Sequence, residues 1–163
     1  MKNAIIYYSL DGNCKYVADN LAKELGPDTD IFCLEPVKPY PNQGFMKMLV
    51  GGFAAMLGKK PPIKALKFDA REYDQIILGT PVWASTFAPP LRTFFMNNYI
   101  MDKPIALYAC SSGGNAESTF KKLKDALEGC KINENHLSLV DPYTKKKDED
   151  LVAIQEFAAD LLT

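Results

Sequence analysis

The stretch AIIYYSLDGNCK, residues 4–15, joins a run of apolar residues to a polar turn and the expected start of a helix. The first backbone N–H groups of a helix have no partner within the helix, and the helix dipole favours negative charge beside them. The glycine at position 12 lets the backbone approach a phosphate closely, and Ser9 and Asn13 add polar side chains. Residues 9–14 therefore predict an anion site at the end of the first strand.

Composition and charge exclude several classes of protein. The chain has 163 residues, of which 47% are apolar and 24% are charged, and this fits a single domain over residues 1–163. Because the net charge is −1, no positive field is available for a nucleic acid, and we expect no nucleic-acid partner. The four cysteines form no CxxC pair, so we expect neither a metal ion nor a disulfide framework.

The N-terminal sequence and the hydropathy pattern bear on location. Residues 1–8 carry no signal-peptide pattern, and no apolar run is long enough to cross a bilayer. We therefore expect a cytoplasmic protein with no membrane partner.

Strand and helix patterns alternate five times along the chain. Mostly continuous apolar runs predict strands over residues 3–8, 30–34, 73–79, 104–110 and 136–140. Apolar residues at helical spacing predict helices over residues 13–25, 90–98, 116–127 and 148–162. This alternation is typical of an α/β fold with a doubly wound sheet of five parallel strands, covered by helices on both faces. In such folds, ligands bind beyond the carboxyl ends of the strands.

Residues 36–66 depart from the simple alternation. Five prolines surround an apolar core, residues 45–57, in which Phe45, Leu49 and Phe53 fall at helical spacing. One interpretation is a crossover helix between the second and third strands. The other is a partly exposed helix that covers a ligand or forms a dimer contact, and the two are compatible.

Two further loops follow apolar strands and carry features of a ligand site. The loop over residues 79–90 contains Trp83, the only tryptophan, which suits contact with a flat heteroaromatic ring but equally suits anchoring the loop on the core. The loop over residues 111–115 reads SSGGN, and it is either a second edge of the same site or a flexible turn and helix cap.

The three loops together give the chain a specific resemblance. The first, SLDGNC at residues 9–14, is similar to the T/S-x-T/S-G-x-T/S phosphate loop of the flavodoxin family. The segment GTPVWA at residues 79–84, followed by APPLRTF at residues 88–94, is similar to the segment that flanks the flavin in many bacterial flavodoxin-like proteins. The chain thus resembles a short-chain flavodoxin over nearly its whole length.

This resemblance implies the strand order 2-1-3-4-5 and flavin mononucleotide (FMN) as the cofactor. Residues 9–14 would surround the phosphate, residues 81–84 would contact the isoalloxazine ring, and residues 111–115 would approach its pyrimidine side. The implied cofactor-binding residues are Ser9, Leu10, Asp11, Gly12, Asn13, Cys14, Pro81, Val82, Trp83, Ala84, Ser111, Ser112, Gly113, Gly114 and Asn115. No side chain stands out as catalytic, and the only histidine, His136, is interpreted as structural.

Two positions depart from the phosphate-loop pattern. Hydroxyl residues are replaced by Asp11, whose carboxylate repels a phosphate unless it bonds elsewhere, and by Cys14, whose thiol is a weaker donor. Lys15 is a candidate to offset part of this repulsion. We therefore predict weaker, more exchangeable FMN binding than in a dedicated carrier.

The resemblance leaves three functions open. The first is an FMN-binding electron-transfer protein that works with a redox partner protein. The second is an NAD(P)H-dependent FMN or quinone oxidoreductase, whose partners are NAD(P)H and a small acceptor, with residues 45–57 walling its pocket. The third is a flavin-free binding domain of the same fold. A homodimer is compatible with each of them.

Overall fold

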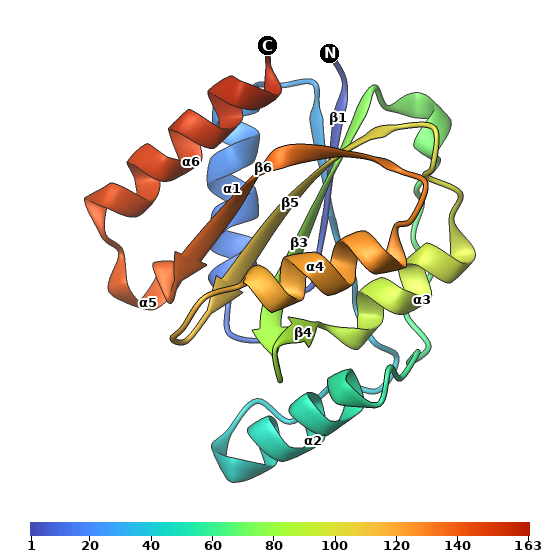
Figure 1. Cartoon of the computed structure of the whole chain (residues 1–163), viewed down its shortest axis with the longest axis vertical. Coiled ribbons are helices and arrows are strands. Elements are labelled where there is room, and N and C mark those ends of the chain that lie inside the picture. Colours follow the sequence, from blue (N-terminus) through green and yellow to red (C-terminus); the bar gives the residue numbers. More distant parts are fainter.

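One sheet forms the centre of the molecule (Figure 1). The computed structural model describes residues 1–163, leaving aside only the side chain of Met48. Five strands of the sheet run parallel: β1 (Asn3–Tyr7), β2 (Thr29–Cys33), β3 (Gln75–Trp83), β5 (Pro104–Ser111) and β6 (Lys131–Val140). Their order is β2-β1-β3-β5-β6, which confirms the predicted order 2-1-3-4-5, because the short strand β4 (Thr86–Phe87) lies off this path.

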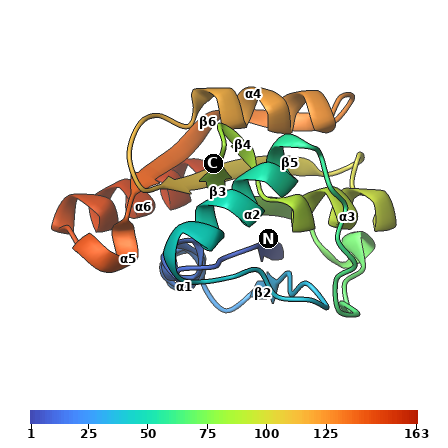
Figure 2. The same ribbon diagram turned by 90° about the horizontal axis from the view of Figure 1, so that it is seen from below.

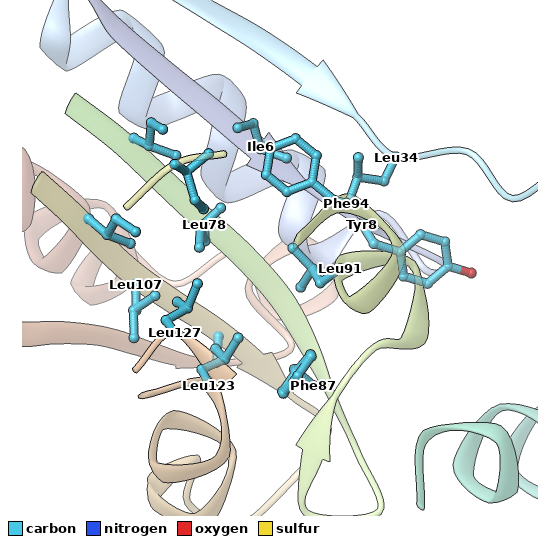
Figure 3. Close-up of a cluster of buried hydrophobic side chains, with 14 of the residues drawn as sticks. Ile6, Tyr8, Leu34, Leu78, Phe87, Leu91, Phe94, Leu107, Leu123 and Leu127 are labelled. Carbon is cyan, nitrogen blue, oxygen red and sulfur yellow. The ribbon is translucent and has the colours of Figure 1, made fainter. Parts of the chain in front are cut away.

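Helices cover both faces of the sheet. One face carries α1 (Asn13–Leu25) and α6 (Asp148–Leu161), and the other carries α3 (Pro89–Asn97) and α4 (Glu117–Ala126) (Figure 1). Successive strand residues point to opposite faces, so Ile5 packs under α1 and α6 whereas Ile6 packs under α3 and α4. Figure 3 shows the second of these clusters, in which Ile6 and other strand side chains lie beside those of α3 and α4. Burial on both faces explains the continuous apolar runs in the sequence.

The remaining helices lie near the ends of the strands. They are α2 (Gly44–Met56), the 3-10 helix η1 (Ala70–Glu72) and α5 (Pro142–Lys145). α2 connects β2 to β3 but covers neither face of the sheet; it crosses the carboxyl ends of the strands near β3 and β4 (Figure 2). Residues 45–57 therefore form the predicted crossover helix, and this helix is largely exposed. That it covers a ligand or forms a dimer contact stays a prediction. None of the helices in the part of the chain that the structure describes has the length and apolar character to span a membrane.

The strand boundaries differ from prediction by more than two residues at two places, and the short antiparallel strand β4 joins the five predicted parallel strands. β3 continues to Trp83, so the expected loop over residues 79–90 is in fact a strand end, a tight hairpin and the antiparallel strand β4. The turn is Ala84-Ser85 rather than the common Asn-Gly, so the sequence carried no hairpin signal there. β6 begins at Lys131 instead of residue 136. The search for apolar runs missed the first half of this strand because it is polar and largely exposed.

Tyr108 packs against Gly79 and reaches across to α1. The Tyr108 ring is fully buried, and a Cβ atom at Gly79 would stand only 2.0 Å from its Cζ atom. The Tyr108 hydroxyl donates a hydrogen bond of 2.9 Å to the backbone carbonyl of Cys14, in the first turn of α1. Burial raises the pKa of Tyr108 well above its ordinary value, so the hydroxyl keeps its proton and remains a donor. The first turn of α1 is thereby held at the carboxyl edge of the sheet.

The close approach at Gly79 predicts a large effect on stability. Gly79→Ala should lower the free energy of unfolding by about 3 kcal/mol, because the enclosed Tyr108 ring has no room to move aside. Gly113→Ala is the matched control, since no atom lies within 4 Å of a Cβ at that position, and its change should stay within about 0.5 kcal/mol. Urea unfolding followed by circular dichroism measures both variants. Equal stabilities would contradict this account of the packing.

His136 predicts a pH dependence of stability. Its ring packs against Phe120 with centroids 4.8 Å apart, and neither ring nitrogen has a hydrogen-bond partner among the described residues. Burial, with the nearby Lys124, lowers the pKa of His136 below its ordinary value of 6.5. The histidine of the unfolded chain therefore binds a proton more readily than that of the folded chain. The folded state loses stability as the pH falls from above 6.5 toward the lowered pKa of His136.

We accordingly expect the single histidine resonance to titrate with a midpoint below pH 6.5 in an NMR titration. His136→Phe should reduce the loss of unfolding free energy between about pH 7 and about pH 5.5. A histidine that titrates at or above its ordinary value would show that this environment is wrongly described.

Candidate functional site

A pocket of about 550 Å³ lies at the carboxyl ends of the strands. The carboxyl ends of β3 and β5, the turns that follow β1, β3 and β5, and α2 line it. All the predicted site residues line this pocket except Gly12, Gly114 and Asn115. The residues that line it without having been predicted are Asn42, Gly44, Lys47, Gly52 and Cys110.

The β1 side of the pocket ends in the first turn of α1. Gly12 precedes the helix with a φ of +87°, a left-handed conformation that favours glycine. The first helical hydrogen bond runs from the Tyr16 N–H to the Gly12 carbonyl at 2.9 Å, so the N–H groups of residues 13–15 lack helical partners. The buried Ser9 hydroxyl oxygen also has no hydrogen-bond partner among the described residues, and Ser9 lines the pocket. This set of donors suits an anion.

Asp11 is paired with a lysine from α2. The Nζ atom of Lys47 lies 2.6 Å from the Oδ2 atom of Asp11, and both residues line the pocket. Lys15, the counter-charge suggested by the sequence, instead pairs with Asp19 at 2.6 Å. The Asp11 carboxylate is therefore matched by a cation that lies 36 residues further along the chain.

Cys14 and Cys110 form a buried pair of free thiols at the pocket. Both side chains are almost fully buried, and each lines the pocket. Burial and the contact with Cys110 raise the pKa of Cys14, so this thiol stays protonated. A buried, protonated thiol is not an effective nucleophile. Within the described residues, no group of three or more His, Cys, Asp or Glu side chains is arranged to hold a metal ion.

The β3–β4 hairpin forms one wall of the pocket through a strained turn. Ala84 and Ser85 both have positive φ, +48° and +56°, as expected for the tight two-residue turn that suits twisted strands. The Ser85 carbonyl accepts hydrogen bonds of 3.0 Å from the Ser118 hydroxyl and from the Lys122 ammonium group. Because both donors belong to α4, this helix holds the turn in place.

Trp83 both anchors the end of β3 and borders the pocket. Tyr8 and Tyr40 meet its indole edge-on, with ring centroids 5.4 Å and 5.2 Å away. Gly51 of α2 lies against another part of the indole, because a Cβ atom there would stand 3.1 Å from the Cζ3 atom of Trp83. Trp83 therefore anchors this part of the chain, as one interpretation has it, and also lines the pocket; its contact with a flat ring stays a prediction.

The loop after β5 contributes only its first part. Ser111, Ser112 and Gly113 line the pocket, whereas Gly114 and Asn115 do not. The Ser111 hydroxyl donates to the Gly114 carbonyl at 3.2 Å, and Gly114 has a φ of +83°. These two features make a compact turn that leads into α4.

The residues missed by the sequence analysis come mainly from the α2 region. Lys47 alone left a signal, as a cation within an apolar helix pattern. Lys47 lies at the pocket because α2 lies at the ends of the strands rather than on a face of the sheet. Helical periodicity does not predict where a helix packs. Cys110 was assigned to its strand, and the neighbouring thiol of Cys14 became visible only in the fold.

Comparison with known proteins identifies the family. The family model described as Flavodoxin matches residues 2–152, so the chain belongs to the flavodoxin family. No curated protein sequence matches this chain.

Several solved structures are similar in fold. A putative flavoprotein from Bacteroides eggerthii is 20% identical with a TM-score of 0.78, over 99% of this chain and 98% of its own. A flavoprotein from Lactobacillus acidophilus in complex with FMN is 21% identical with a TM-score of 0.71, over 89% of this chain and 97% of its own. Oxidised flavodoxin 2 from Bacillus cereus is 18% identical with a TM-score of 0.64, over 98% of this chain and 96% of its own. The fold is therefore flavodoxin-like.

The contact between Gly51 and Trp83 predicts a spectroscopic effect. Gly51→Ala should push α2 away from the indole and move the fluorescence of this single tryptophan to longer wavelength, because water reaches the ring. Gly52→Ala is the matched control, since a Cβ there meets its nearest neighbour at an ordinary 3.9 Å. Both changes add helix propensity of about 1 kcal/mol, so only the clash distinguishes them. Identical emission spectra would contradict the position of α2.

Proposed function

We propose that this member of the flavodoxin family binds FMN in the pocket at the carboxyl edge and acts in electron transfer. The single observation that carries the proposal is the composition of the pocket. Hydrogen-bond donors without partners lie on its β1 side, and the only tryptophan of the chain lies on its β3 side. The similar flavoprotein from Lactobacillus acidophilus was solved in complex with FMN, which supports the same cofactor here.

The β1 side suits the phosphate of FMN. The Ser9 hydroxyl and the N–H groups of residues 13–15 would donate to it. Gly12 does not line the pocket, and its part is the left-handed backbone that begins the helix. Lys47 lies 2.6 Å from the Asp11 carboxylate, so the repulsion of this carboxylate for a phosphate is offset. We therefore propose that FMN is held more firmly than the phosphate-loop sequence alone predicts.

The β3 and β5 sides suit the flat ring. The isoalloxazine would lie between residues 81–84 and residues 111–113. Trp83, fixed by Tyr8 and Tyr40, would supply a rigid apolar wall that excludes water from one side of the ring. Gly114 and Asn115 line no part of the pocket, so we assign them no contact with the cofactor.

Electron transfer fits the chemistry of the side chains that line the pocket. When bound, FMN supplies a ring that accepts and releases electrons, while the protein orients the ring and tunes its potential. Asp11 and Lys47 are paired with each other, and the buried thiol of Cys14 keeps its proton. These groups are poorly suited to proton transfer with a substrate, whereas electron transfer needs no such group.

One observation favours a second function, an NAD(P)H-dependent FMN or quinone oxidoreductase. α2 supplies Gly44, Lys47 and Gly52 to the pocket, which gives it a wall in addition to the three loops. A carrier needs the edge of its ring open to a partner protein. A wall beside the ring instead suits an enzyme that encloses a small acceptor.

The Asp11–Lys47 pair predicts a specific effect on FMN binding. Lys47→Gln should weaken binding about tenfold at low ionic strength, because the unpaired Asp11 carboxylate then repels the phosphate. The double variant Asp11→Asn/Lys47→Gln should recover most of this loss. Lys15→Gln is the matched control, because Lys15 pairs with Asp19 and does not line the pocket.

Quenching of FMN fluorescence on titration with the apoprotein measures all these affinities. Unchanged affinity in Lys47→Gln would contradict the role of the ion pair. Failure of the wild-type chain to bind FMN would instead favour a flavin-free binding domain.

Steady-state kinetics distinguish the carrier from the enzyme. As a carrier, the FMN-loaded protein should oxidise NADH or NADPH at a negligible rate in the presence of a quinone, because no partner reductase is present. Addition of a purified flavodoxin reductase should then allow its reduction. Rapid turnover of the nicotinamide without any partner would contradict the carrier function and support the oxidoreductase.

A further inference from the structure

α2 turns small residues toward the protein and large apolar residues toward the outside. Its inward side is made of small residues: Gly51 lies against Trp83, and Ala55 is only 1% exposed. Its large apolar side chains face outward instead, with Phe45 exposed by 74% and Phe53 by 57%. The exposed apolar face of α2 and its end comprises Phe45, Met46, Leu49, Val50, Phe53, Met56 and Leu57. A contiguous apolar surface of this kind on a folded chain indicates a docking site.

The charge around α2 indicates what docks there. Residues 36–68 contain six lysines and no acidic residue, in a chain whose net charge is −1. Two of the six, Lys47 and Lys64, are paired with carboxylates from outside this segment. Lys59 and Lys60 follow α2 closely, and both are exposed. Neither has an ion-pair partner within 4 Å among the described residues. The occupant should therefore combine an apolar layer with negative charge at its surface.

A lipid surface with anionic headgroups has both properties. A helix of 13 residues is about 20 Å long, too short to span a bilayer but suited to lie in the plane of its interface. A second copy of this chain is a poorer match. In a two-fold dimer through α2, residues 36–68 of one copy would offer no carboxylate to the unpaired Lys59 and Lys60 of the other.

We propose that the apolar face of α2, with Lys59 and Lys60 beside it, docks this protein on anionic membrane surfaces. The side chains of Phe45, Leu49 and Phe53 enter the headgroup region, and the two lysines contact the anionic headgroups. This inference revises the expectation of no membrane partner, which rested only on the lack of a spanning segment. Docking is independent of FMN, so it stands or falls separately from the proposed cofactor.

Vesicle sedimentation tests the proposal with the full chain, with and without added FMN. The two probes are vesicles of phosphatidylcholine alone and vesicles of equal parts phosphatidylcholine and phosphatidylglycerol. We expect binding to the anionic vesicles, little binding to the neutral ones, and weaker binding at physiological than at low ionic strength. Leu49→Ser/Phe53→Ser should abolish binding.

Lys59→Gln/Lys60→Gln should weaken binding to anionic vesicles about 25-fold, or about fivefold for each lysine. Lys23→Gln/Lys131→Gln is the matched control, because both lysines are exposed but lie at the amino-terminal edge of the sheet. Val152→Ser, at an exposed apolar residue of α6, is the control for the loss of apolar surface. Both controls should bind as the wild type does, and circular dichroism verifies that every variant is folded.

Three results would overturn the proposal. One is the absence of binding to either vesicle. Another is equal binding of the Lys59→Gln/Lys60→Gln variant and the wild type. The third is a dimer, seen by sedimentation velocity, that dissociates in Leu49→Ser/Phe53→Ser while vesicles remain unbound, which would assign the face to a second copy of this chain.

Discussion

The contact of Tyr108 with Gly79 and α1 is the constraint on which the rest of the structure depends. Only glycine leaves space for a fully buried tyrosine ring at this point of β3, and the hydroxyl then reaches the Cys14 carbonyl at 2.9 Å. This hydrogen bond connects β5, which carries Tyr108, to the first turn of α1. The ring of Tyr108 packs against Gly79 of β3 on the way. The free N–H groups of that turn consequently face the same edge of the sheet as the loops after β3 and β5. The pocket in which we propose that FMN binds follows from that alignment.

α2 completes the pocket in a way that is unusual for a crossover helix. Its small residues let it lie close to Trp83, and its lysine neutralises the Asp11 carboxylate. The large apolar side chains are left on the outside, where they are exposed. One helix thus links the pocket to an exposed surface, and the function of that surface does not follow from the flavodoxin fold itself.

The sequence predicted the elements that depend on local pattern. Continuous apolar runs located the strands because both faces of the sheet are covered, as the packing of Ile5 and Ile6 on opposite faces shows. Gly12 was singled out because glycine lets the backbone approach a phosphate, and the structure gives a different reason for it, a left-handed φ of +87° before α1. The Ala84-Ser85 hairpin was missed, because these residues adopt positive φ without being typical turn formers and are held by Ser118 and Lys122. Lys47 was missed as a partner of Asp11, because a contact across 36 residues depends on where α2 lies.

The central claim is that the pocket binds a phosphorylated flavin with its phosphate at the start of α1. Calorimetric titration of the apoprotein with FMN and with riboflavin tests it most directly, because the two ligands differ only in the phosphate. The account predicts that FMN binds about a hundredfold more tightly than riboflavin, as expected for one or two charge-assisted hydrogen bonds to the phosphate. Equal affinities for the two ligands would contradict it, because the donors at the start of α1 would then take no part in binding.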